Sequence, residues 1–214
     1  ESELKAVKDV ADEYPDKKIG FMIPLVISVS ELKETKRIAR EIVNVPDNVK
    51  IGIMVETPAS VQIIDKLCEE GIDFVSFGTN DLTQFTLGID RNNGDVQYLY
   101  DESNEAVLKS IGHVIRRCKI NGVETSICGQ AGSKPEIAKF LVMEGIDSIS
   151  VNPDAALKIS EVVLKVEKEL EESEKVGVEV SEKEVDGVGE EKWTKEVSEV
   201  GGGEEEKMVK EIGE

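Results

Sequence analysis

The chain has 214 residues, of which 26 are Lys or Arg and 45 are Asp or Glu, so its formal net charge is −19. This charge argues against nucleic acid or an anionic membrane surface as a partner, because phosphate groups would repel it. No apolar run reaches the roughly 18 residues of a membrane-spanning helix, and three cysteines without metal-ligand spacing do not suit a secreted disulfide scaffold. We therefore expect a soluble, cytoplasmic, acidic protein.

The acidic charge is concentrated at the C-terminal end. Residues 171–214 hold 16 acidic and 6 basic side chains, together with seven of the 18 glycines. Such a segment buries too little apolar surface to offset its conformational entropy, so we predict a disordered or loosely helical acidic Gly/Glu-rich tail. Residues 1–170 then form the folded domain. Because the chain opens at Glu1 within a helical pattern, we interpret it as a fragment.

Residues 1–170 alternate between helix and strand patterns after an opening helix. The helical segments have readable N-termini: Ser28 with Glu31 and Ser133 with Glu136 are capping-box pairs, and Thr57 precedes a proline. Further helices are expected from about residues 103 and 154. Regular alternation of this kind predicts an α/β fold with a parallel sheet covered by helices. The apolar runs that predict strands are residues 18–23, 51–55, 73–77, 123–127 and 147–151.

Polar and ionisable residues follow four of these predicted strands. In parallel α/β folds the carboxyl ends of the strands form the active-site face. Since neighbouring strands lie ~4.8 Å apart, Glu56 and Asp81 are expected in one small volume. Two carboxylates suit Mg²⁺, although they could equally serve only as helix N-caps. The segments concerned are Glu56-Thr57-Pro58, Gly78-Thr79-Asn80-Asp81, Cys128-Gly129-Gln130 and Asn152-Pro153-Asp154.

Several of these motifs together resemble the phosphoenolpyruvate-utilising enzymes. That family includes phosphoenolpyruvate synthase (pyruvate, water dikinase), pyruvate phosphate dikinase and enzyme I of the sugar phosphotransferase system. The similarity extends over about residues 17–165, and Cys128-Gly129-Gln130-Ala131 looks most like the synthases. Ile27 departs from them, because synthases often carry Arg at that position. The other motifs that carry the resemblance are Ile51–Pro58, Gly78–Gln84 with Asp90-Arg91, and Gly145–Asp154.

The resemblance implies that residues 1–170 are the last five βα units of a TIM-type (β/α)8 barrel that binds phosphoenolpyruvate and pyruvate. It also implies partner domains that this sequence lacks, one carrying a phosphohistidine and one binding ATP. With them the enzyme would form phosphoenolpyruvate, AMP and phosphate from pyruvate, ATP and water. We expect the 214-residue chain by itself not to carry out the full reaction.

The resemblance further implies roles for individual residues. Mg²⁺ would be held by Glu56 and Asp81 and would chelate the ketone and carboxylate oxygens of the substrate. Gly78, Thr79 and Asn80 would contact substrate oxygens.

Two further roles follow from the same resemblance. Arg91 would pair with a phosphate or carboxylate, and Cys128 would exchange the proton at C3. A thiol suits this role because its pKa of ~8.5 can be tuned toward neutrality.

Each of these residues also has an ordinary structural interpretation. Cys128 could be a buried, inert cysteine, as we interpret Cys68 and Cys118. Arg91 could be a surface charge on a loop, while Gln130 and Asn152 could be hydrogen-bonding residues at strand ends. The single histidine, His113, falls on the polar side of its helical pattern, which is typical of a surface histidine.

Two alternatives to a synthase remain open at this point. One is an enzyme I or dikinase barrel, which the sequence of the absent histidine domain would distinguish. The other is a non-catalytic barrel fragment used for oligomer assembly. Five strands of an eight-stranded barrel leave two unpaired edges, so we expect a homo-oligomer or a partner fragment.

Overall fold

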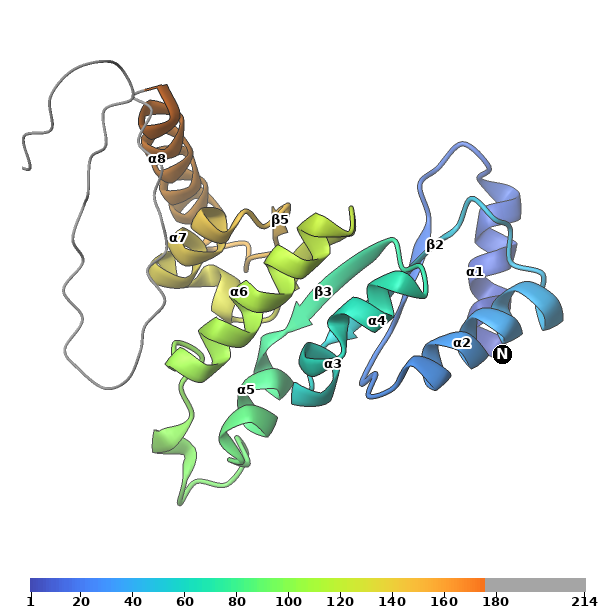
Figure 1. Cartoon of the computed structure of the whole chain (residues 1–214), viewed down its shortest axis with the longest axis horizontal. Helices are drawn as coiled ribbons and strands as arrows, with labels where there is room; N and C mark the ends of the chain where they lie inside the picture. Colours follow the sequence, from blue (N-terminus) through green and yellow to red (C-terminus); the bar gives the residue numbers. More distant parts are fainter. Residues whose placement is uncertain (176–214) are drawn as a thin grey trace, which may run out of the picture. The chain divides into compact units, whose positions relative to one another are not determined.

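The computed structural model describes residues 1–175, and Figure 1 shows their arrangement. The contacts divide the chain into two units, Glu1–Val163 and Leu164–Glu214. From residue 176 onward the predicted acidic tail lies outside the described residues. The helices are α1 Ser2–Glu13, α2 Val29–Arg37, α3 Pro58–Gln62, α4 Ile64–Glu69, α5 Thr79–Leu87, α6 Glu105–Ile120, α7 Pro135–Glu144 and α8 Ala156–Lys175, with a π-helical turn η1 Ile38–Ile42 and 3-10 turns η2 Gln97–Leu99 and η3 Ala131–Ser133.

The strands form one five-stranded sheet in the order β1-β2-β3-β4-β5, and every neighbouring pair is parallel. Consecutive strands that are neighbours in space are what a (β/α)8 barrel contains. The predicted α/β fold of five successive βα units is therefore confirmed. The strands are β1 Gly20–Ile23, β2 Lys50–Val55, β3 Phe74–Gly78, β4 Glu124–Cys128 and β5 Ser148–Ile149.

The two faces of the sheet differ in what they carry. Side chains alternate between faces along a strand, and residues in register on parallel neighbours share a face. Val55, Phe77 and Ile127 form one such row, and all three are fully buried in the main core. The next row, towards the carboxyl ends, belongs to the opposite face and contains Gly78 paired with Cys128.

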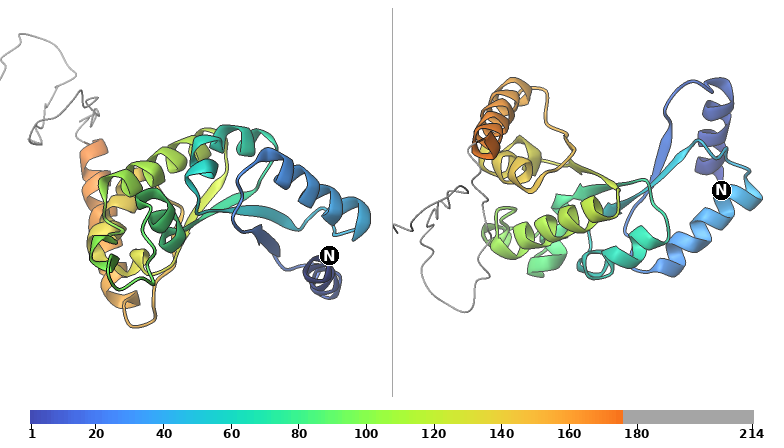
Figure 2. Two further views of the ribbon diagram at one scale, coloured as in Figure 1. Left: turned by 90° about the horizontal axis from the view of Figure 1, so that it is seen from below. Right: turned by 45° about the horizontal axis from the view of Figure 1, so that its top comes forward.

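Helices α3, α4 and α6 lie along one side of the sheet and supply the other half of the main core (Figure 2). Their apolar positions contact one another as well as the strands. Cys68 on α4 and Cys118 on α6 are buried there and hydrogen-bond to each other. This bond and burial raise the pKa of Cys118. The interpretation of these two cysteines as core residues is confirmed.

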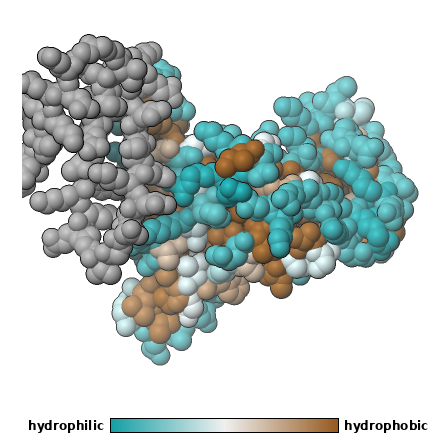
Figure 3. All heavy atoms as spheres, in the orientation of Figure 1, coloured by the Kyte–Doolittle hydropathy of each residue, from teal (hydrophilic) through white to brown (hydrophobic). Residues whose placement is uncertain are grey.

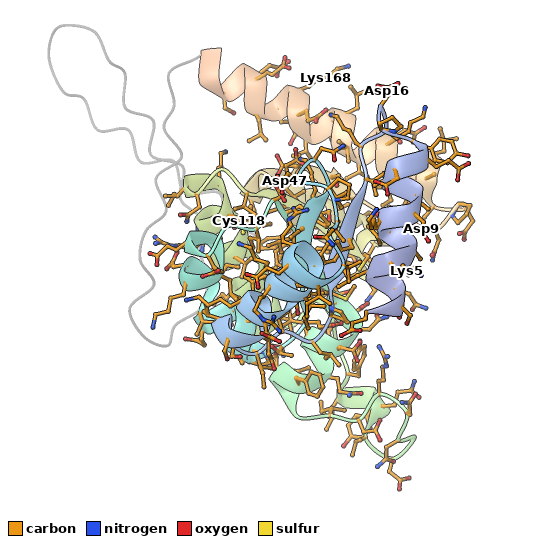
Figure 4. The ribbon with its side chains drawn as sticks, turned by 90° about the vertical axis from the view of Figure 1, so that its right-hand side faces the viewer. Lys5, Asp9, Asp16, Asp47, Cys118 and Lys168 are labelled. Atoms are coloured by element: carbon orange, nitrogen blue, oxygen red, sulfur yellow. The ribbon has the colours of Figure 1, made fainter. Side chains whose placement is uncertain are left out.

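Helix α1 belongs to a second, smaller core. Its Ala11 packs with Ala39, Val45 and Val49, all of them buried. The opposite side of α1 is polar, and Figure 4 shows Lys5 and Asp9 along it. The amphipathic pattern that predicts a helix at the start of the chain is confirmed.

One predicted capping box is present and the other is absent. Ser28 accepts a hydrogen bond from the N–H of Glu31, whose carboxylate accepts from the N–H of Ser28 in return. The prediction for Ser133 is wrong. This residue lies in η3, and its hydroxyl accepts the N–H of Asn152 at 2.9 Å, so α7 begins at Pro135 without a side-chain cap.

Candidate functional site

Three of the predicted site residues lie side by side at the carboxyl edge of the sheet. Glu56 follows Val55, which is in register with Phe77, so Glu56 is level with Gly78. Gly78 is in turn in register with Cys128 on β4. The sheet therefore places the carboxylate of Glu56 and the thiol of Cys128 on either side of a residue that has no side chain.

Glu56 is a buried carboxylate with only 4% of its surface exposed. Its Oε1 accepts the N–H of Leu25 at 2.7 Å. Leu25 has φ of +50°, a left-handed conformation that leucine rarely adopts and that costs free energy. Burial raises the pKa of Glu56 and the negative charge of Asp81 raises it further, while the Leu25 hydrogen bond and Arg91 lower it.

Gly78 is required for steric reasons. A Cβ at this position would lie 2.6 Å from Oε2 of Glu56 and 2.9 Å from its Cβ. The absence of a side chain at Gly78 therefore gives the Glu56 side chain its space.

Asp81 and Arg91 flank this row. Asp81 is in the first turn of α5, where a carboxylate is favoured by the helix dipole. A guanidinium nitrogen of Arg91 lies 3.5 Å from its carboxylate, and both side chains are about one-third exposed. The backbone N–H of Arg91 donates to Gln84 at 3.2 Å, which ties the Arg91 loop to α5. A partly exposed pair of this kind is open to an incoming anion or cation.

Cys128 is the last residue of β4 and is half-buried. Its Sγ donates to the backbone carbonyl of Phe77 at 3.3 Å. Among the described residues it is the cysteine with exposed surface, since Cys68 and Cys118 are buried. It is therefore the thiol that a small molecule can reach.

The segment Gly78–Asp81, which the resemblance implies contacts the substrate, forms the start of helix α5. Gly78 is the N-cap of α5, and Thr79, Asn80 and Asp81 make up its first turn. The Thr79 side chain is fully buried and donates to Glu102 at 3.3 Å. The backbone carbonyl of Asn80 accepts the Tyr100 hydroxyl at 3.0 Å.

Three residues next to this turn match no sequence motif: Tyr100, Glu102 and Lys134. Glu102 is 4% exposed and its carboxylate lies 3.1 Å from Nζ of Lys134. These residues carry no motif, because their partners come from segments far away in the sequence. The burial of Glu102 is therefore apparent only from the folded structure, because the residues around it in the sequence are polar.

The other candidates lie away from this row. Gln130 and Asn152 are exposed, and the N–H of Asn152 is used to bond Ser133. His113 is exposed on α6, as predicted. A hollow of about 470 Å³ lies at the opposite, amino ends of β4 and β5.

The donor set at the row suits a hard divalent cation. Glu56 follows β2, and Asp81 lies in the first turn of α5, after β3. The negative charge of Asp81 raises the pKa of Glu56, so the two carboxylates interact electrostatically. Within residues 1–175 no group of three or more His, Cys, Asp or Glu side chains gathers closely enough to hold a metal. Mg²⁺ is commonly held by one or two protein carboxylates, with waters and substrate oxygens completing the shell. The two carboxylates therefore fit Mg²⁺ better than a metal that needs a full protein cage.

Residues 1–168 match the family model described as PEP-utilising enzyme, PEP-binding domain. The chain belongs to this family. The phosphoenolpyruvate synthase of Pyrococcus furiosus is 56% identical over 170 residues, which are 79% of this chain and 21% of that protein. A probable phosphoenolpyruvate synthase of Archaeoglobus fulgidus is 51% identical over 79% of this chain and 22% of its own length.

The resemblance inferred from the motifs is thus confirmed at the level of the family. The phosphoenolpyruvate synthase of Helicobacter pylori is 40% identical over 79% of this chain and 21% of its own length. The chain spans about a fifth of the length of these curated relatives. Among residues 1–175, no helix is long and apolar enough to cross a bilayer.

Proposed function

We propose that this chain is the pyruvate- and phosphoenolpyruvate-binding part of a phosphoenolpyruvate synthase. The observation that supports it is the row Glu56, Gly78 and Cys128 at the carboxyl edge of the sheet, with Asp81 and Arg91 beside it. The relatives are named phosphoenolpyruvate synthase, which favours a synthase over an enzyme I or dikinase barrel. The complete reaction converts pyruvate, ATP and water into phosphoenolpyruvate, AMP and phosphate.

The proposed binding mode uses the charges on either side of Gly78. Mg²⁺ held by Glu56 and Asp81 would polarise the keto oxygen of pyruvate and so make its methyl protons more acidic. Arg91 is close enough to Asp81 to reach the same ligand and would pair with its carboxylate or phosphate. The missing Cβ of Gly78 leaves room for the Glu56 carboxylate that would hold the Mg²⁺. The N-terminus of α5 adds a partial positive charge at the same place.

Cys128 would move the proton at C3 of the substrate. As a thiolate it accepts a methyl proton when phosphoenolpyruvate is made, and as a thiol it returns the proton in the reverse direction. Because Cys128 is in register with Gly78, on the side opposite Glu56, Sγ would approach the ligand from that side. The phosphoryl group would come from a phosphohistidine on another domain, with ATP bound on a third.

The test is binding of oxalate, a planar dianion with the shape of pyruvate enolate, to the 214-residue chain. Calorimetry is expected to show oxalate binding that requires Mg²⁺, and bound oxalate is expected to slow alkylation of Cys128 by iodoacetamide. Asp81→Asn should lose both effects because one of the two metal carboxylates is gone. Glu124→Gln, at the amino end of β4, is the matched control and should keep both. Oxalate binding that is unaffected by removing Mg²⁺ would contradict the proposal.

We also propose that the chain associates with a second copy of itself. Among residues 1–175, β1 and β5 each pair on one side only, which leaves backbone groups of two strands without sheet partners. Apolar side chains also gather over α5 and the segment that follows it (Figure 3), and Phe85 on α5 and Leu99 in η2 are about half exposed. Sedimentation is expected to show a mass that rises with protein concentration. A monomer at all concentrations would rule this association out.

A further inference from the structure

Glu102 is a buried acidic residue outside the proposed ligand-binding row. It lies between η2 and α6 in a stretch of mostly polar residues, yet only 4% of its surface is exposed. A carboxylate is expensive to remove from water and stays charged inside a protein only when it is paired and hydrogen-bonded. The contacts that offset the cost of burying the Glu102 carboxylate therefore indicate the role of Glu102.

The carboxylate of Glu102 joins two turns that are distant in sequence. Its Oε1 accepts the hydroxyl of Thr79, in the turn after β3, at 3.3 Å. Its Oε2 lies 3.1 Å from Nζ of Lys134, which directly follows η3 in the segment after β4. The hydroxyl proton of Thr79 points to Glu102, so Thr79 uses its only donor on this residue.

The same two turns are also in direct contact with each other. Gly129, the residue after Cys128, has φ of +103°, and a Cβ there would lie 2.9 Å from Oγ1 of Thr79. The Thr79 hydroxyl therefore occupies the space beside Gly129 where a Cβ would lie, so the two turns pack against each other at this point. Cys128 is covalently attached to Gly129 and therefore moves with it.

The segment containing Glu102 holds α5 at a second point. The Tyr100 hydroxyl donates to the backbone carbonyl of Asn80 at 3.0 Å. Burial raises the pKa of Tyr100, as does the charge of Glu102, so its hydroxyl remains a donor at neutral pH. Residues 100–102 thus contact two consecutive residues in the turn that contains Asp81.

We propose that Glu102, together with Lys134, is a positioning residue that fixes the turn carrying Asp81 against the turn carrying Cys128. It sets the distance between the metal carboxylates and the thiol without touching the substrate itself. This inference rests on the proposed function for the meaning of that distance, but the coupling between the two turns can be measured independently of it. Lys134 neutralises the buried charge and anchors it to the Cys128 side.

The test uses the 214-residue chain and two measurements, the alkylation rate of Cys128 by iodoacetamide and the affinity for oxalate in Mg²⁺. Glu102→Gln is expected to raise the alkylation rate several-fold, because the neutral amide no longer pairs with the charge of Lys134 and the two turns are held together less firmly. Its oxalate affinity should fall about tenfold, the effect of losing a hydrogen bond to a charged group. Lys134→Met should shift both in the same direction, and the double variant should be no worse than the more affected single variant, because the two residues act as a unit.

The matched control is Glu144→Gln, which removes an ion pair of 2.6 Å with Arg116 between α6 and α7, outside the proposed site. A purely structural role for Glu102 would lower its melting temperature as in this control and leave both measurements at wild-type values, which would overturn the proposal. Lys134 is 39% exposed, so its variant keeps the test open if Glu102→Gln does not fold. If the wild-type chain does not bind oxalate, the proposed function fails while the alkylation rates still decide the role of Glu102.

Discussion

The turns after β2 and β3 lie next to each other and share one sequence feature, but they are held in different ways. Both place a threonine directly after the residue at the carboxyl edge, Thr57 after Glu56 and Thr79 after Gly78. Thr57 is the N-cap of α3: its Oγ1 accepts the N–H of Ser60 at 3.1 Å. Thr79 caps nothing, because it is already inside α5, and its hydroxyl donates to Glu102 instead.

The difference shows two ways of building a site edge. The first turn is stabilised mostly by residues within three positions of it, helped by a bond from the Thr57 hydroxyl to the carbonyl of Val26 at 3.0 Å. The second depends on residues that arrive from beyond α5. The local bonds around Thr57, together with the N–H of Leu25, give Glu56 a fixed position. A turn held by distant residues can couple Asp81 to Cys128.

The largest effect is expected from Gly78→Ala, which affects both turns at once. The new methyl group would overlap the Glu56 side chain, and Glu56 is held by Leu25 and cannot move away freely. We expect a loss of about 1–3 kcal/mol of stability from overpacking and loss of Mg²⁺-dependent oxalate binding. Thermal melting and calorimetry measure the two. Gly94→Ala is the control, since a Cβ there meets nothing within 4 Å, and equal behaviour of the two variants would contradict the steric argument.

Glu56→Gln should change how stability depends on pH. The pKa of Glu56 is raised by burial, so the folded state binds its proton more tightly than the unfolded state does. The stability linked to this proton is present below the ordinary carboxyl pKa of ~4.3 and is lost as pH rises through the raised value. Without metal, the melting temperature of Glu56→Gln relative to wild type should therefore increase from about pH 4 to pH 7. A constant difference would show that the carboxylate is not destabilised by burial.

Thr57→Ala should weaken the first turn only. Loss of the N-cap is expected to cost about 1–2 kcal/mol, because the N–H of Ser60 loses its acceptor inside the protein. The alkylation rate of Cys128 should stay at the wild-type value, since the Thr57 hydroxyl bonds to Val26 and Ser60 and not to the Cys128 segment. Thr57→Ser should recover most of the stability. If Thr57→Ala changed the alkylation rate as much as Glu102→Gln, the two turns would not be distinct.

The same contrast explains what the sequence predicts and what it does not. The strands and the cap at Thr57 are predicted correctly, because apolar runs and N-cap signals act over a few neighbouring residues. The capping box at Ser133 is not formed, because a backbone N–H from another βα unit takes its hydroxyl. Helix α5 is not predicted from the sequence, because the glycine at its N-cap, Gly78, is typical of a loop.

The site divides in the same way. Glu56, Gly78 and Cys128 are predicted to share one edge, because each ends or follows a strand and parallel strands align those ends. Glu102 cannot be found from its neighbours in sequence. Its partners Thr79 and Lys134 follow two different strands, and only tertiary structure brings them together.

Tyr100→Phe gives the smallest expected effect and tests how the second turn is held. The variant removes one hydrogen bond to the Asn80 carbonyl at 3.0 Å, so it should cost about 0.5–1.5 kcal/mol of stability. Its effect on Cys128 alkylation should be smaller than that of Glu102→Gln, because the Tyr100 hydroxyl bonds to α5, whereas Glu102 links α5 to Lys134 in the segment after Cys128. Thermal melting and alkylation kinetics measure both quantities on the same samples. An equal or larger effect on alkylation would mean that the position of α5 alone, and not the link from Glu102 to Lys134, sets the exposure of Cys128.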